Sequence, residues 1–191
     1  MNMPVDTLAD PIAAHAKEML AHLGEDPRRA GLRDTPQRFA NALRFLTGGY
    51  EAEPRDVVGN GVFDAEGEGV VLVRDIEFHS LCEHHMLPFF GRVHVAYLPG
   101  ERIIGLSKLA RVVEYFARGL QVQERLTTQV AGWLDDHLEP KGVGVVIEAE
   151  HLCMTLRGVQ KPGTMTVTSA LTGVVREDPR TRQEFLDLVR R

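Results

Sequence analysis

The stretch FFGRVHVAYLPG, residues 89–100, decides the fold of this chain. Apolar side chains alternate with other side chains from Val93 to Tyr97. A period of two is typical of a strand that buries one face, so the stretch predicts a strand over residues 89–98. Pro99-Gly100 predicts the turn that ends it.

Similar patterns lie on both sides of this strand. Residues 70–78, 143–150 and 164–171 predict three further strands. Between the second and third strands runs a long helical stretch with two apolar stripes and a break at Gly119. The stripes are Leu109, Val112, Val113 and Phe116, then Leu126, Val130, Trp133 and Leu134. The order ββααββ, with a short helix over residues 180–191, predicts an α+β fold in which paired helices cover an antiparallel sheet.

The N-terminal part has a different pattern. Asp10-Pro11 and Thr35-Pro36 each predict a helix start, and glycines at 24 and 48–49 predict the ends. The spacing therefore predicts an antiparallel helical pair. We expect a disordered tail over residues 1–10, a helical region over residues 11–68 and the main α+β domain over residues 69–191.

Composition narrows the class of protein. The chain has 191 residues, 43% of them hydrophobic and 26% charged, as in ordinary globular domains. A net charge of −5 argues against a nucleic-acid partner. No apolar run reaches the roughly 20 residues that span a bilayer, and the N-terminus does not resemble a signal peptide. We therefore expect a cytoplasmic protein without a membrane partner, whose cysteines are thiols or metal ligands.

Two short segments carry the candidate metal ligands. Both cysteines of the chain lie within three residues of a histidine, in Cys82-Glu83-His84-His85 and in His151-Leu152-Cys153. One helical turn would point Cys82 and His85 at one place, and strand alternation would put His151 and Cys153 on one face. Two thiolates and one imidazole suit Zn²⁺ and leave a fourth position open, as in catalytic zinc sites. Ferrous iron is a second candidate, and two buried thiols without a metal are the simpler alternative.

The remaining histidines of these segments are candidate proton carriers. An unperturbed imidazole has a pKa of about 6.5, so histidines beside a metal, here His84 and His151, are suited to proton transfer near neutral pH. The alternative for His84 is a solvent-exposed side chain. We interpret Glu83 as a surface or structural residue.

Residues 105–111 predict a helix start that binds an anion. Ser107 is a natural N-cap, and Lys108 and Arg111 lie on one face of the first turn. Cations at a helix N-terminus oppose its dipole unless an anion binds there. Ordinary solvated charges are the alternative.

A polar segment follows Gly119. Gln123 and Glu124 could read the hydrogen-bonding edge of a base, or could lie on a helix surface. Arg157, downstream of Cys153, could be another anion contact or a surface arginine.

Together these segments resemble the GTP cyclohydrolase I family. The resemblance runs from about residue 10 to the C-terminus. The matching segments are GEDP (24–27), DTPQR (34–38), SLCEHH (80–85), IGLSK (104–108), QVQERL (121–126), HLCM (151–154) with RGV (157–159), and RQEFL (182–186). The family converts GTP and water into formate and 7,8-dihydroneopterin triphosphate, the entry step to tetrahydrofolate. The resemblance implies a tunnelling fold and a homodecamer with active sites at subunit interfaces.

The resemblance also assigns roles to residues. It implies that Cys82, His85 and Cys153 bind zinc, and that His84 and His151 transfer protons. Glu124, aided by Gln123, would read the guanine. The triphosphate and ribose contacts would be Ser107, Lys108, Arg111 and Arg157, with Arg38 reaching in from a neighbouring subunit.

Two other classes compete with this interpretation. One is a metal-stabilised binding or assembly module without chemistry, which would need a fourth protein ligand and would unfold on chelation. The other is a different tunnelling-fold enzyme acting on a purine or pterin. The pairing of the CEHH and HLC segments counts against the latter.

Overall fold

The computed structural model describes residues 10–190, which form two compact units that divide between Thr47 and Gly48. The expected disordered tail of residues 1–10 lies outside the described residues, apart from Asp10. The first unit contains α1 (Pro11–His22) and α2 (Thr35–Leu46).

Asp10 ties the two helices of the first unit together. Its carboxylate accepts from the Ile12 backbone N–H at 3.0 Å, so it caps α1 as the sequence predicted. The same carboxylate pairs with Arg44 at 2.7 Å and accepts from the Gln37 amide at 3.2 Å, and both of these residues lie on α2. The Arg44 guanidinium holds the pKa of Asp10 well below its usual range.

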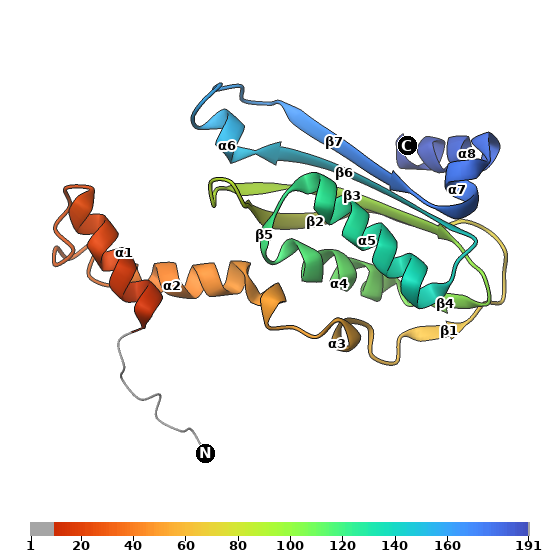
Figure 1. Ribbon diagram of the computed structural model, residues 1–191, viewed down its shortest axis with the longest axis horizontal. Helices are drawn as coiled ribbons and strands as arrows, with labels where there is room; N and C mark the ends of the chain where they lie inside the picture. The colour runs from red at the N-terminus through yellow and green to blue at the C-terminus, as the bar shows by residue number, and fades with distance from the viewer. Residues whose placement is uncertain (1–9, 191) are drawn as a thin grey trace, which may run out of the picture. The chain divides into compact units, whose positions relative to one another are not determined.

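The second unit is a sheet with helices on both faces (Figure 1). Its helices are η1 (Gly48–Tyr50), α3 (Pro54–Val58), α4 (Leu106–Ala117), α5 (Gln123–Leu138), α6 (Leu152–Thr155), α7 (Gly173–Glu177) and α8 (Pro179–Arg190). Its strands are β1 (Val62–Asp64), β2 (Val71–Cys82), β3 (Pro88–Leu98), β4 (Arg102–Ile104), β5 (Leu120–Gln121), β6 (Gly142–His151) and β7 (Met165–Leu171). The order ββααββ is present as predicted, in the elements β2, β3, α4, α5, β6 and β7.

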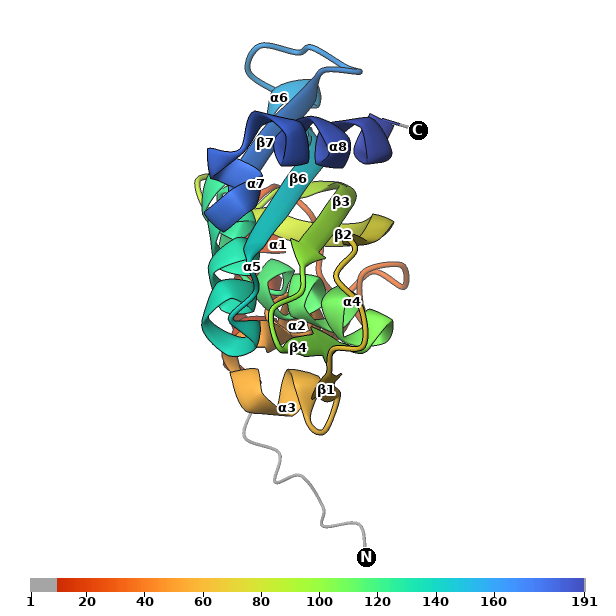
Figure 2. The same ribbon diagram turned by 90° about the vertical axis from the view of Figure 1, so that its right-hand side faces the viewer.

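The main sheet has the order β5-β2-β3-β6-β7. All of its pairs are antiparallel except β2 with β5, which is parallel and spans only two residue pairs. Helices α4 and α5 lie on one face, as Figure 2 shows from the end of the sheet. Helices α7 and α8 cover the other face.

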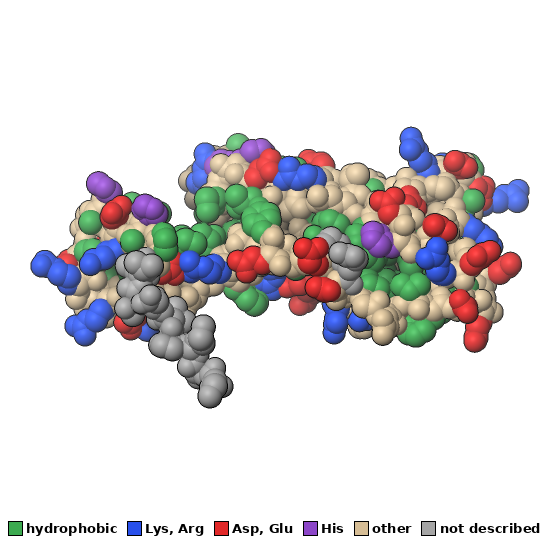
Figure 3. Space-filling model, turned by 60° about the horizontal axis from the view of Figure 1, so that its bottom comes forward, with side chains coloured by type: hydrophobic (Ala, Val, Ile, Leu, Met, Phe, Trp, Pro, Cys, Tyr) green, Lys and Arg blue, Asp and Glu red, His purple; other side chains and the backbone are tan. Residues whose placement is uncertain are grey.

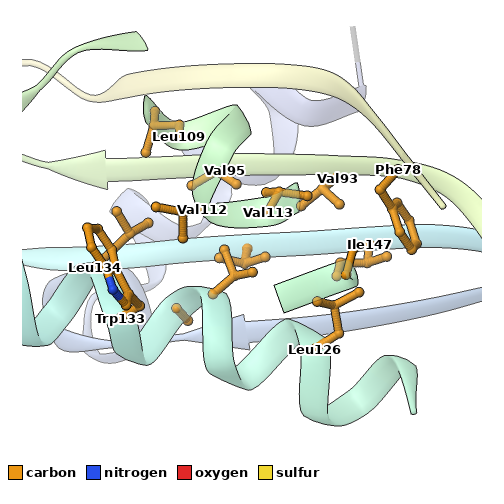
Figure 4. Close-up of a cluster of buried hydrophobic side chains, with 14 of the residues drawn as sticks. Phe78, Val93, Val95, Leu109, Val112, Val113, Leu126, Trp133, Leu134 and Ile147 are labelled. Carbon is orange, nitrogen blue, oxygen red and sulfur yellow. The ribbon is translucent and has the colours of Figure 1, made fainter. Parts of the chain in front are cut away.

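Strand alternation builds the core between the sheet and the two long helices. Val93, Val95 and Ile147 are fully buried and face the apolar stripes of α4 and α5 (Figure 4). On the opposite face, Phe185 of α8 packs against Gly144, where an added Cβ would lie 2.8 Å from the ring. The alternation read from the sequence is therefore confirmed on both faces.

Several short features are absent from the sequence prediction. They include the two-stranded sheet of β1 and β4, the two-residue strand β5 and the one-turn helix α6. A bulge also interrupts β2, where Asp75 has a φ of 58° and its backbone N–H donates to His94 Nδ1 at 3.2 Å. Each spans too few residues to produce a periodic pattern.

Over residues 10–190, every helix is too short or too polar to cross a membrane. Acidic and basic side chains are interspersed on the face displayed in Figure 3.

Candidate functional site

The candidate site lies at one end of the main sheet, where several elements start or stop. Strand β2 ends at Cys82, which is paired with Gln121 of β5, and α5 starts at Gln123. Strand β6 ends at His151, which is paired with Phe89 of β3. The topology thus brings both predicted metal segments to the same end of the sheet, as the ribbon of Figure 1 shows.

The first metal segment is a tight turn between β2 and β3. The Cys82 carbonyl accepts from the backbone N–H of His85 at 3.3 Å and of Met86 at 2.8 Å. A single turn, and not a helix, therefore brings Cys82 and His85 to one side. The Cys82 side chain is buried, whereas both histidines are exposed.

The second segment differs from the prediction. Strand β6 stops at His151, and Cys153 lies on the one-turn helix α6 instead of in an extended segment. Strand alternation is therefore not what points Cys153 toward the site. A turn of helix directly after the strand does this.

The three predicted ligands nevertheless form one group. The ligand atoms of Cys82, His85 and Cys153 all lie within 4.8 Å of one another, and Cys82 Sγ is 4.0 Å from His85 Nδ1. Around a tetrahedral zinc with bonds of about 2.0–2.3 Å, ligand atoms lie roughly 3.5–3.8 Å apart. Small side-chain movements would close the group to that geometry.

The chemistry of the donors also fits a cation. Burial raises the pKa of the Cys153 thiol, and the neighbouring Cys82 raises it further. Two close sulfurs disfavour the thiolate form unless a positive charge lies between them. The group is therefore suited to a divalent metal ion.

His84 lies beside this group without belonging to it. Its Nδ1 is 3.9 Å from Cys82 Sγ, and its ring centroid is 6.3 Å from that of His85 with the planes at 78°. The side chain is exposed and so could exchange protons with a substrate or with water.

His151 is fixed more firmly than His84. Its ring stacks on Phe89, with centroids 4.6 Å apart and planes within 3°. Its Nε2 lies 2.8 Å from Gln123 Oε1. Burial lowers the pKa of His151, and the charge of the nearby Glu124 partly opposes that shift.

Gln123, which was predicted together with Glu124 as a possible base reader, is buried. Its side chain is 1% exposed and is enclosed by β6 and β7. Both polar atoms of the side chain, Nε2 and Oε1, are hydrogen-bonded within the chain. Glu124, the next residue on the first turn of α5, is exposed and remains available for a base.

Arg157 lies over the metal group. Its Nη1 contacts His85 Nε2 at 2.6 Å, so His85 Nδ1 is the nitrogen that faces the cysteines. The rest of the Arg157 side chain is exposed, as an anion contact requires.

The predicted anion-binding helix start lies elsewhere. Helix α4 begins beside β4 and ends next to β5, so Ser107 and Lys108 are at the end of α4 remote from Cys82 (Figure 1). Twelve residues of helix span about 18 Å. Within one chain, therefore, these residues and the metal group are not brought together.

The details of that helix start also differ from the prediction. The N-cap is Gly105, because Leu106 is already helical, so Ser107 is not the cap. Lys108 is half-buried, with its stem against Gly61. Arg111 is exposed and lines a shallow hollow that is formed with η1 and α3.

Arg38 belongs to the first unit. It lies on α2, is exposed, and pairs with Asp34 at 3.1 Å.

Two contacts at the site have no counterpart in the sequence prediction. Glu83 forms an ion pair with Arg125, which also donates to Gln121 at 3.0 Å and so links the metal turn to α5. Arg125 holds the pKa of Glu83 below its usual range. This agrees with the structural role predicted for Glu83. The stacking of Phe89 on His151 is the other contact, and the register of β3 and β6 alone determines it.

Comparisons with known proteins agree with the geometry. The sequence model of the family described as GTP cyclohydrolase I matches residues 12–190. A protein of Deinococcus radiodurans named GTP cyclohydrolase 1 is 59% identical over 173 residues, which cover 91% of this chain and 80% of that protein. Proteins of the same name from a Synechococcus strain and from the rat are each 54% identical. They cover 97% and 94% of this chain, and the matched parts are 81% and 74% of their own lengths.

Proposed function

This chain belongs to the GTP cyclohydrolase I family, and we propose that it opens the imidazole ring of GTP by hydrolysis at C8. The products are formate and, after ribose rearrangement and ring closure, 7,8-dihydroneopterin triphosphate, which enters tetrahydrofolate or pterin synthesis. The observation that carries the proposal is the group of Cys82, His85 and Cys153, with two further histidines beside it. Neither competing class gains support from the comparisons.

Zinc is the metal that we propose for this group. Two sulfurs and one imidazole nitrogen within 4.8 Å of one another fit its tetrahedral geometry with one position left for solvent. When bound, zinc lowers the pKa of water toward neutrality and so supplies the nucleophile for C8. The protein's contribution is to hold the three donors at the ends of β2 and β6.

The two histidines beside the group supply the proton transfers. Ring opening needs a proton on the departing nitrogen, and formate release needs a proton to be moved again. His84 is exposed next to Cys82, and His151 is half-buried against Phe89. Because burial lowers the pKa of His151, its neutral form prevails near neutral pH and can accept a proton.

Glu124 is the residue that we propose to read guanine. Its exposed carboxylate stands on the first turn of α5, directly after the buried Gln123 and close enough to His151 to shift its pKa. A carboxylate accepts hydrogen bonds from ring N–H and amino groups, which guanine presents together and adenine does not.

The triphosphate contacts require a second subunit. Arg157 already lies on the metal group, whereas Ser107, Lys108 and Arg111 lie on α4, whose start is remote from that group in the same chain. A site that uses both sets must combine two chains, with Arg38 as a further contact from a neighbour. We therefore propose active sites at subunit interfaces, and the resemblance to the family leads us to propose a homodecamer as the assembly.

The sheet has the edges that such an assembly needs. Strand β7 forms one edge, and β5 pairs with β2 only at Leu81 and Cys82, so most of the outer side of β2 is open in the part of the chain described. Open edges can pair with strands of another chain. We place the assembly in the cytoplasm, a reducing compartment in which Cys82 and Cys153 stay free thiols until a metal binds.

The function is tested by incubating the zinc-loaded protein with GTP. We expect formate and 7,8-dihydroneopterin triphosphate in equal amounts, the latter detected by its fluorescence after oxidation. ATP serves as the control nucleotide. An absence of both products from protein with a full complement of metal would contradict the proposed function.

A further inference from the structure

Gln123 is a polar side chain near the site that is almost completely enclosed, with 1% of its surface exposed. It is the first residue of α5, yet its amide reaches under the helix to the sheet. Three oxygens surround Nε2, namely Ile147 O at 3.0 Å, Thr166 O at 2.9 Å and Thr168 Oγ1 at 3.1 Å. Residues of both β6 and β7 therefore hold the carboxamide in place.

These neighbours fix which way the amide points. The backbone carbonyls of Ile147 and Thr166 can only accept hydrogen bonds, so the NH₂ group must face them. The opposite orientation would place Oε1 against two carbonyl oxygens. Oε1 therefore faces His151 Nε2, which lies 2.8 Å away.

Two threonines complete the hydrogen-bond network behind the amide. Thr127 Oγ1 donates to the Gln123 backbone carbonyl at 2.7 Å, so its own oxygen accepts from Thr168 Oγ1, also at 2.7 Å. With its proton committed to Thr127, Thr168 Oγ1 can only accept from Gln123 Nε2. Each donor and acceptor in this chain of bonds is thereby assigned, and the carboxamide cannot flip without losing several hydrogen bonds.

We infer that Gln123 is a positioning residue that fixes the neutral imidazole of His151 as its Nε2–H tautomer. An amide oxygen can only accept, so the proton between Gln123 Oε1 and His151 must lie on Nε2. The unprotonated Nδ1 is then the nitrogen that can take a proton in the reaction. Phe89 fixes the plane of the ring from the other side.

This inference rests on the proposed function only in one respect, namely that Nδ1 takes a proton during the reaction. It also changes the predicted role of Gln123, because an amide with all its polar atoms in use has none to offer to a base. Recognition of guanine by this pair of residues then belongs to Glu124 alone. The effect of Gln123 on catalysis is exerted through His151.

The tautomer can be measured directly in the zinc-loaded protein labelled with ¹⁵N at histidine. The His151 signals are assigned by comparison with His151→Asn. We expect a protonated, pyrrole-like Nε2 and an unprotonated, pyridine-like Nδ1 in the wild-type protein. A His151 that is protonated on Nδ1 would overturn the inference, and this result needs no Gln123 variant.

A substitution at Gln123 separates positioning from packing. Gln123→Met keeps the approximate shape of the side chain and removes the acceptor, so the ¹⁵N signals of the two His151 tautomers should average. The matched control is Gln129→Met on the same helix, because Gln129 bonds to Gln121 and not to His151. Averaging in Gln129→Met, or none in Gln123→Met, would contradict the assignment.

Kinetics test the consequence for turnover. Gln123→Met should lower kcat for GTP by at least about tenfold while KM changes by less than about threefold. In a His151→Asn background the same substitution should have no further effect on kcat. A change in KM or in GTP-over-ATP preference with kcat intact would return Gln123 to base recognition.

The outcomes also separate this inference from the proposed function. If the wild-type protein forms no product from GTP, the proposed function fails, and the ¹⁵N signals still decide the tautomer. If product forms and Nδ1 carries the proton, the function stands and the inference fails.

Discussion

The ring of His151 stacks on Phe89 with centroids 4.6 Å apart and planes within 3°. The two residues are direct partners in the register of β3 and β6, so the sheet itself sets this contact. Phe89 is fully buried and also meets Phe78 edge-on at 5.7 Å. Phe89 therefore connects the hydrophobic core to His151, which is proposed to transfer a proton.

Phe89→Ala should lower both stability and turnover. Truncating a buried phenylalanine costs about 3–5 kcal/mol of unfolding free energy, measurable by urea denaturation at a fixed protein concentration. The control is Phe90→Ala, because Phe90 is only half-buried and points to the other face of the strand. Equal losses of stability in the two variants would contradict the assignment of Phe89 to the core.

Substitutions of the adjacent residues His84 and His85 should separate metal binding from catalysis. His85→Ala removes a donor from the group of three and should lose both bound metal and turnover. His84→Ala should keep the metal and lose about 10²–10⁴-fold in kcat, as expected for a general acid or base. Elemental analysis of metal content, together with kcat, provides the measurement. Loss of metal from both variants would make His84 a ligand.

Glu124→Gln should weaken the preference of the enzyme for GTP over ATP. A hydrogen bond to a charged group contributes about 1.5–3 kcal/mol, so GTP-over-ATP preference should fall by at least about tenfold. The ratio of kcat/KM for the two nucleotides measures this. Asp136→Asn is the control, since Asp136 is exposed near the other end of α5. An unchanged preference in Glu124→Gln would remove Glu124 from base recognition.

Asp10 should make the packing of α1 on α2 dependent on pH. Because Arg44 lowers the pKa of Asp10 in the folded state, the stabilisation is present above the unfolded pKa of about 3.9. It is lost as pH falls through the lower folded pKa. Asp10→Asn keeps a capping oxygen but loses the ion pair. The rates of amide hydrogen exchange in α1 should therefore differ between the wild-type protein and Asp10→Asn at neutral pH. In strong acid the two rates should converge. A difference that does not change with pH would contradict this.

Periodic patterns predicted most of the fold. The four long strands of the main sheet and the helices α4 and α5 were placed correctly because each spans enough residues to show which face is buried. Short elements such as β5 and α6 carry no such pattern. Their positions depend on contacts with distant strands, of which the pairing of Cys82 with Gln121 is an example.

For the candidate site, some residues were predicted correctly and others were not. The three donors could be identified because cysteine and histidine are rare and close in sequence, and the structure brings them together. Ser107 was misplaced as an N-cap because Gly105 and Leu106 also allow a helix start two residues earlier than expected. The burial of Gln123 was not predicted, because nothing local indicates that the first residue of a helix is buried against two strands.

Removal of the metal tests the central claim most directly, because that claim makes the group of Cys82, His85 and Cys153 an open catalytic centre. A chelator should abolish turnover of GTP while circular dichroism shows a folded chain. Titration with zinc should then restore turnover in proportion to bound metal, with saturation at about one ion per chain. Full turnover without metal, or unfolding of the chain on chelation, would contradict the claim.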